Sequence, residues 1–98
     1  MGKSREMVEG SQYGLSVTSA TPVVLTVPDG AYTAEIYVRT ASVVFTREGV
    51  IPTATKGIQA DPGDIILLNS RSELVYFRCI AVSTTATLDV SYFSDVSG

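Results

Sequence analysis

Hydrophobic and polar residues alternate along several short stretches of the chain, which is the pattern of half-buried β-strands. The clearest alternation covers residues 34–40, where Ala34, Ile36 and Val38 fall on one face of the expected strand. Shorter strands of the same kind are expected at residues 15–19, 22–27, 42–47 and 86–93. No stretch of helical length repeats the spacing of about 3.6 residues that an amphipathic helix requires. The pattern therefore predicts strands along the whole chain.

Two further stretches are apolar at nearly every position. They read "IILL" at residues 65–68 and "ELVYFRCIAV" at residues 73–82. We expect each to be a strand, the second with Val75, Phe77 and Cys79 on one face. A continuous apolar run is typical of a strand that is covered on both faces, or of an edge strand that a partner buries. Because one thin sandwich does not readily cover so many apolar positions, the two runs favour association with another molecule.

Turn residues separate these stretches. The sequence "PDG" at residues 28–30 and the pair Glu48 and Gly49 each predict a tight turn. The stretch "PTATKGIQADPGD" at residues 52–64 has two prolines and two glycines but no aromatic residue, and we expect a long connection at one end of the fold. About seven short strands between such turns predict an all-β fold, an antiparallel β-sandwich or a jelly roll.

The chain is long enough for one domain, since it has 98 residues. Residues 1–13 are polar and aperiodic, and we expect them to form an N-terminal arm. Residues 14–98 are expected to form a single β-sandwich domain. The N-terminus lacks the apolar core of a signal peptide, and no stretch approaches the roughly 18 apolar residues that cross a bilayer. The sequence therefore predicts no membrane partner.

Charge argues against nucleic acid as a partner. The net charge is −3, and only 17% of the residues are charged. The seven cationic residues are scattered rather than clustered, whereas phosphate binding needs a basic patch. Few charges among many valine, threonine and serine residues are typical of a sheet protein in which part of the surface is covered.

The inventory of reactive side chains is short, and we expect no enzyme activity, no cofactor and no metal. The chain has no histidine, which removes the commonest general base and metal ligand. The single cysteine, Cys79, excludes an intrachain disulfide, and its apolar strand favours an inert core thiol. Asp61 and Asp64 could form a calcium site or a catalytic pair, but aspartates around Pro-Gly more often stabilise a turn.

Arg78 lies inside the most apolar run, and three environments are open to it. It can pair as a buried charge with a carboxylate of Glu35, Glu73 or Asp89; it can face a partner subunit; or it can face solvent. Aromatic residues offer a different surface, a sugar-binding platform, although tyrosines with one wet end are equally normal in sheets. The residues concerned are Tyr32, Tyr37, Tyr76, Tyr92 and Phe93.

Residues 41–93 contain an ordered set of short motifs: "VFTREG", "PTATKG", an apolar strand after "GD", then "FRCI" and "ATLDVSYF". In this order they resemble a group of small phage and prophage proteins from virion structural gene neighbourhoods. The resemblance covers about half of the chain. It implies a β-rich virion component, such as a capsid decoration or cementing protein or a head or tail accessory. It implies no active-site residue.

The resemblance also implies partners. We expect a homo-oligomer, with a trimer as the specific expectation because decoration proteins often occupy local three-fold positions, and binding to the major capsid protein or another virion protein. The protein is expected in the virion after synthesis in the bacterial host cytoplasm, with the arm reaching over a neighbouring subunit. The expected interface residues are Arg5, Tyr13, Thr55, Lys56, Leu74, Tyr76 and Arg78.

Two other functions stay open at this point. A monomeric carbohydrate-binding module would use the tyrosines and the loop tip at Thr53, Thr55 and Lys56. An intracellular regulatory or inhibitor domain is the third possibility, suggested only by small size and acidity. An oligomer without glycan affinity would favour the virion protein, and a monomer that binds glycans would favour the carbohydrate-binding module.

Overall fold

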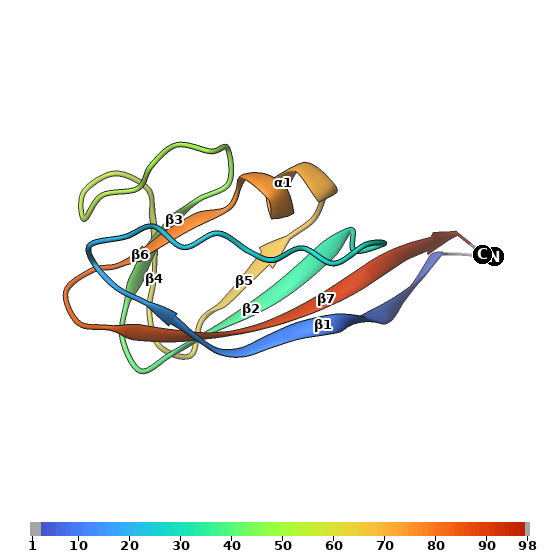
Figure 1. Cartoon of the computed structure of the whole chain (residues 1–98), viewed down its shortest axis with the longest axis horizontal. Helices are drawn as coiled ribbons and strands as arrows, with labels where there is room; N and C mark the ends of the chain where they lie inside the picture. The colour runs from blue at the N-terminus through green and yellow to red at the C-terminus, as the bar shows by residue number, and fades with distance from the viewer. Residues whose placement is uncertain (1–2, 98) are drawn as a thin grey trace.

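The computed structural model describes the backbone of residues 3–97 and the side chains of residues 7–94. Within that part of the chain, seven strands form two antiparallel sheets (Figure 1). The four-stranded sheet has the order β1-β7-β2-β5 and the three-stranded sheet the order β4-β3-β6. The elements are β1 (Lys3–Val17), β2 (Thr33–Arg39), β3 (Val43–Thr46), β4 (Ile58–Ala60), β5 (Ile65–Leu68), α1 (Arg71–Tyr76), β6 (Arg78–Ala81) and β7 (Ala86–Ser97). This confirms the expected antiparallel all-β class with about seven strands; the jelly roll stays a prediction.

A single core lies between the two sheets. In β2 the alternation seen in the sequence is observed directly, with Ala34, Ile36 and Val38 buried. The same core cluster takes in Leu88 and Val90 from β7. From the three-stranded sheet it takes, among others, Val43, Phe45, Cys79 and Ala81. The apolar faces of both sheets are thereby removed from water, which is the main stabilising contribution in a domain of this size.

The outer face of the three-stranded sheet is also covered, by the loop of residues 47–57. All four residues of β3 are buried, including the outward Val44 and Thr46. The Thr46 hydroxyl donates a hydrogen bond to the Val50 carbonyl. A Cβ placed on Gly57 would lie 2.6 Å from Cγ1 of Val44, so the backbone passes directly over that side chain. The first part of the stretch at residues 52–64 is therefore a cover for the sheet.

The apolar stretch at residues 73–82 is not one strand, and the expectation of a strand there is wrong for its first half. Residues 71–76 form the helix α1, whose N-cap Ser70 accepts a hydrogen bond from the Glu73 amide at 3.3 Å. Glu73 Oε1 in turn accepts from the Asn69 amide at 2.8 Å. This reciprocal capping satisfies donors at the start of the helix, and local capping outweighs the strand propensity of the following residues. Leu74 consequently faces the core, while Val75 is 46% exposed.

Two other expected elements differ. Residues 22–27 form no strand; only Val23 pairs, exchanging backbone hydrogen bonds of 2.8 and 3.2 Å with Cys79 and so covering the outer edge of β6. Conversely, the long connection at residues 52–64 contains the short strand β4, which pairs with β3. Whether each segment forms a strand depends on pairing with a neighbouring strand, and this pairing cannot be predicted from the local residue pattern.

The N-terminal segment forms most of β1, where the sequence favoured an arm followed by a short strand. Residues 3–17 pair with β7 of the same chain from Lys3 opposite Ser97 to Val17 opposite Ala86. This two-stranded ribbon projects beyond the rest of the fold (Figure 1) and makes the molecule long, with extents of 45 × 23 × 20 Å. Residues 1–2 of the expected arm lie outside the described part. Among described residues, no helix has the length and apolarity needed to cross a membrane.

Candidate functional site

The strand β5 exposes apolar side chains on the outer face of the four-stranded sheet. Ile66 and Leu68 point into the core and are buried, whereas Ile65 and Leu67 are 51% and 52% exposed. The sequence left open a strand covered on both faces or an edge strand that a partner buries. The first interpretation is wrong, because β5 is the last strand of its sheet and its outer face is exposed.

The backbone of β5 has hydrogen-bonding groups directed away from the sheet. The Val38 amide donates to the Asp64 carbonyl at 3.0 Å and the Val38 carbonyl accepts from the Gly63 amide at 2.9 Å, so Gly63 and Asp64 lie together opposite Val38 in a bulge just before β5. The Asp64 carbonyl therefore faces β2. The register continues without interruption from Tyr37 opposite Ile65 to Ala34 opposite Leu68. Because hydrogen-bonded and non-hydrogen-bonded pairs alternate in an antiparallel ladder, Ile66 and Leu68 bond to β2. The amide and carbonyl groups of Ile65 and Leu67 therefore face the open edge.

This edge lacks the usual protection against pairing with another strand. Natural sheets protect edge strands with proline, lysine, inward charges or β-bulges. The four residues of β5 include none of these, because the bulge at Gly63 and Asp64 lies before the strand and the register from Ile65 to Leu68 has no shift. An exposed apolar edge of this kind is a template for another strand.

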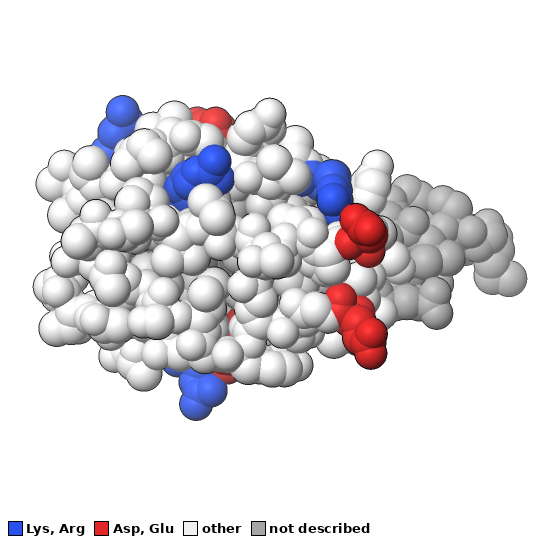
Figure 2. Space-filling view, viewed as in Figure 1, with Lys and Arg blue, Asp and Glu red and all other residues white. Residues whose placement is uncertain are grey.

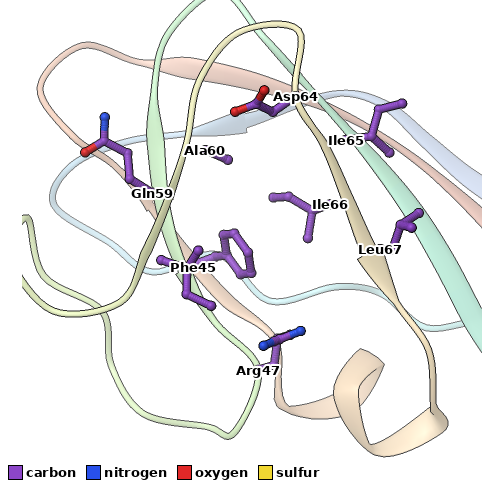
Figure 3. A pocket seen from close by; sticks show the side chains of 9 residues that line it. Phe45, Arg47, Gln59, Ala60, Asp64, Ile65, Ile66 and Leu67 are labelled. Carbon is purple, nitrogen blue, oxygen red and sulfur yellow. The ribbon is translucent and has the colours of Figure 1, made fainter.

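A groove of about 330 Å³ runs between β5 and β4, the edge strand of the other sheet (Figure 3). Phe45 and Ile66, both nearly buried, lie inside it, and the exposed Ile58, Ile65 and Leu67 border it. Asp64 lies near one end of the groove and Arg47 at the other (Figure 3). The remaining lining residues are Gln59 and Ala60. The site is thus an apolar groove with one charge of each sign at its ends.

The acidic end is built by the turn between β4 and β5. Asp64 Oδ2 accepts from the Asp61 amide at 2.8 Å, and the Asp64 amide donates to the Asp61 carbonyl at 2.9 Å. Asp61 Oδ1 accepts from Gln59 Nε2 at 3.0 Å and from the Ser42 hydroxyl at 2.7 Å, and these bonds lower the pKa of Asp61. The two aspartates therefore stabilise the turn. Among described residues, no group of three or more cysteine, aspartate or glutamate side chains is placed to hold a metal ion.

The basic end is a free cation. Arg47 is exposed and follows β3 directly, at the start of the loop that covers the three-stranded sheet. Among the described side chains it forms neither an ion pair nor a hydrogen bond, whereas Arg39 pairs with Asp89 at 2.9 Å. An exposed arginine beside an apolar groove is well suited to a carboxylate of a partner.

The outer face beside β5 continues the site onto β2. Tyr37 lies opposite Ile65 and is 41% exposed. Its hydroxyl donates to Glu35 Oε1 at 3.1 Å, and the hydrogen bond with this carboxylate raises the pKa of Tyr37. The apolar ring thus extends the exposed surface of Ile65 and Leu67, with the polar end held at the rim.

The structure separates the residues that the sequence suggested for an interface. Tyr13, on β1, is 71% exposed and Tyr76, at the end of α1, is 50% exposed, but they belong to different regions. Thr55 and Lys56 are exposed in a tight turn closed by paired hydrogen bonds between Thr53 and Lys56. The expectation that Leu74 belongs to an interface is wrong, because Leu74 is fully buried in the core and has no surface for a partner. The side chain of Arg5 lies outside the described part.

Among the described side chains, Arg78 forms no ion pair with the carboxylates of Glu35, Glu73 or Asp89 that the sequence offered as partners. Its Nη1 donates to the backbone carbonyls of Val75 at 3.2 Å and Phe77 at 2.9 Å. These are carbonyls at the C-terminal end of α1, where the helix leaves acceptors without intrahelical partners. Arg78 therefore satisfies the end of the helix, and the half-buried guanidinium has a local structural role.

The aromatic residues do not form one platform. Tyr92 is fully buried, its hydroxyl donates to Gln12 Oε1 at 2.6 Å, and burial raises the pKa of Tyr92 to about 12. Tyr32 lies just before β2 and Tyr37 lies within that strand, five residues further along the extended backbone, so they do not share a patch. Cys79 is buried as expected, and burial raises the pKa of its thiol to about 12.

The residues of the groove were missed at the sequence level, except for the apolar run of β5. Ile58 lies in a segment that looks like a turn and Arg47 ends an expected strand, and β3 and β4 bring them beside β5. The usable signal was the run of four apolar residues without a gatekeeping charge. Comparisons of the chain with protein-family models, with curated proteins and with solved structures find no match.

Proposed function

We propose that this protein is a non-enzymatic phage virion structural protein of the capsid decoration or cementing type, which binds copies of itself and the particle surface. The single observation that carries an association role is the unprotected edge strand β5, with the half-exposed Ile65 and Leu67 beside an apolar groove. The assignment to a virion rests on the motifs at residues 41–93 that resemble phage virion components.

The mechanism requires binding and no bond chemistry. Main-chain hydrogen bonds from an added strand supply affinity, and alternate side chains supply specificity. Phe45 and Ile66 offer apolar contact inside the groove, while Arg47 and Asp64 set the direction in which a charged partner lies. The charged side chains on the face shown in Figure 2 are scattered and form no continuous basic patch, which supports a protein partner over nucleic acid.

Quantitative mass spectrometry of purified particles tests the proposal. The protein is counted against the major capsid protein in particles from the phage or induced prophage that encodes it. We expect hundreds of copies per particle for a decoration role, since decoration proteins cover a repeated capsid lattice. A handful of copies would move the protein to a tail or spike, and complete absence would overturn the virion assignment and make glycan binding by a monomer the next hypothesis to measure.

A matched pair of variants tests whether the groove is the surface that binds the particle. Arg47→Glu reverses the free cation at the basic end, and we expect reduced occupancy of the particle. Lys56→Glu makes the same change in charge at the exposed turn that the sequence offered as another contact, outside the lining of the groove. Equal occupancy of both variants would show that the groove is not the site of particle binding, even if the protein is a virion component.

A further inference from the structure

We infer that β5 pairs antiparallel with β5 of a second copy of this chain, about a two-fold axis at Ile66, and joins two four-stranded sheets into one of eight strands. This inference rests on the proposed self-association and names its geometry. It differs from the trimer that the phage resemblance implies, because a strand pairing with itself generates an isologous, two-fold contact.

The hydrogen-bonding pattern of the edge is complementary to itself. Only the backbone groups of Ile65 and Leu67 face outward within β5. In an antiparallel pair centred on Ile66, Ile65 lies opposite Leu67 of the partner subunit, and Leu67 lies opposite Ile65 of the partner subunit. Each of these two pairs exchanges two hydrogen bonds. The four bonds satisfy the two outward amides and the two outward carbonyls of each strand. A register shifted by one residue would place an outward group opposite an inward one and leave it unpaired.

Side chains agree with this register. The exposed Ile65 and Leu67 would contact Leu67 and Ile65 of the partner subunit on the outer face of the joined sheet, which buries apolar surface that one copy leaves in water. Asp64 of the partner subunit would lie opposite Leu68, beyond the Leu67 end of β5. That is the end of the groove where the unpaired Arg47 lies (Figure 3). The two-fold axis therefore brings opposite charges together at both ends of the contact.

The other strand edges do not offer this match. β6 is covered at its outer edge by Val23, which pairs with Cys79. β4 has three residues and begins after Gly57, whose φ of +132° departs from strand geometry. β1 has two register shifts in its pairing with β7. Among the strand edges in the described part of the chain, only β5 combines an unbroken register with an apolar outer face.

Sedimentation velocity on the purified full chain tests the contact. We expect a concentration-dependent dimer, and we expect Leu67→Lys to raise its dissociation constant by about tenfold or more, because it removes two apolar contacts and places two cations on a diagonal across the axis. Ile51→Lys is the matched control, since Ile51 is 58% exposed but does not belong to the groove. A wild-type monomer at about 100 μM, or equal dimerisation of both variants, would overturn the inference.

Disulfide formation tests the register. Ile65→Cys and Leu67→Cys are prepared separately and oxidised alone and as a mixture. In the proposed register residues 65 and 67 of different copies have Cα atoms about 5.5 Å apart, within disulfide reach, whereas identical residues lie on a diagonal about 7–8 Å apart. We expect covalent dimers in the mixture and few in either variant alone. Equal cross-linking of the single variants would overturn the register.

These results are separable from the fate of the proposed function. A dimer with the expected cross-links in a protein that is absent from particles would support the β5 contact and overturn the virion assignment. A monomer that is abundant on particles would do the reverse.

Discussion

The two outer strands of the four-stranded sheet, β1 and β5, close that sheet in opposite ways. β1 is fifteen residues long, carries charged residues and pairs irregularly with β7. β5 has four residues, all apolar, and pairs with β2 without a break. Both are antiparallel edges of the same sheet, so their differences come from residue chemistry and not from topology.

The β1 edge is protected by bulges that side chains hold in place. Its register shifts on both sides of Gln12, and Gly10 and Gly14 have φ values of +123° and +71°. Between Gln12 and Leu15, the Gly14 amide donates to a side-chain atom, Asp89 Oδ1, at 2.9 Å. A twisted edge of this kind is a poor template for another strand.

Gln12 then ties this irregular strand to the body of the fold. Its Oε1 accepts from the hydroxyl of the buried Tyr92 and from the Thr26 amide at 3.2 Å. β5 has no such attachment on its outer side, where only the groove and the exposed side chains of Ile65 and Leu67 lie. The contrast teaches that one edge of this sheet is protected against pairing with another strand, whereas the other edge is left open.

The largest effect is expected inside β5. Ile66→Ala removes a buried side chain between the sheets and should lower the free energy of unfolding by about 2–5 kcal/mol. Leu67→Ala, on the exposed face of the same strand, should change it by less than about 0.5 kcal/mol while weakening dimerisation. Urea unfolding at low protein concentration measures both. A comparable loss from the two variants would show that the outer face of β5 is already covered within one chain.

Gly57→Ala should be next, because it acts where the covering loop packs on the outer face of β3, directly before β4. A Cβ there would lie 2.6 Å from Val44 Cγ1 and 3.0 Å from the Phe45 carbonyl oxygen, at a positive φ. We expect a loss of about 2–3 kcal/mol from overpacking and backbone strain. Gly63→Ala is the control, since its φ of +95° is also positive but its Cβ would meet no atom within 4 Å. Thermal unfolding should show the smaller loss for Gly63→Ala, and the reverse order would contradict the packing of the loop on β3.

Tyr92→Phe sharpens the description of the β1 edge. It removes the hydroxyl that holds Gln12 but leaves the buried ring, and we expect a loss of about 1 kcal/mol. Tyr37→Phe removes the exposed hydroxyl next to β5 and should leave stability unchanged. Denaturant unfolding of the pair is the measurement. If Tyr92→Phe is silent, Gln12 does not anchor β1 to the body.

The smallest effects should come from the carboxylates at the two edges. The hydrogen bond from the Gly14 amide, followed by that from Arg39, lowers the pKa of Asp89; the hydrogen bonds from Gln59 and Ser42 lower the pKa of Asp61. A lowered folded-state pKa contributes stability above the unfolded value near 4, and this contribution is lost as the pH falls through the folded value. Each exposed pair should contribute little.

Melting temperatures between pH 7 and pH 2 check this sign. Asp89→Asn should lower the melting temperature at pH 7 and make it less sensitive to acid, and Asp61→Asn should do the same at the β5 end. A variant that is more stable than the wild type at neutral pH would contradict a stabilising carboxylate at that edge.

Local pattern was sufficient for the strands that bury one face. The alternation at residues 34–40 is β2, and the apolar run at residues 65–68 is β5. It failed where capping or pairing decided the outcome. Ser70 and Glu73 start a helix inside an apolar run, and Val23 pairs alone although its neighbours alternate as a strand would.

For the site, the sequence by itself determined that this small acidic chain without histidine would form strands, and that an uninterrupted apolar run would need cover. Those properties follow from side-chain chemistry and from the period of two along a strand. Only the tertiary structure decided that this run is an edge strand, that its free backbone groups belong to Ile65 and Leu67, and that Arg47 and Asp64 lie at opposite ends of one groove. Such relations depend on which strands pair, and pairing is a property of the whole chain.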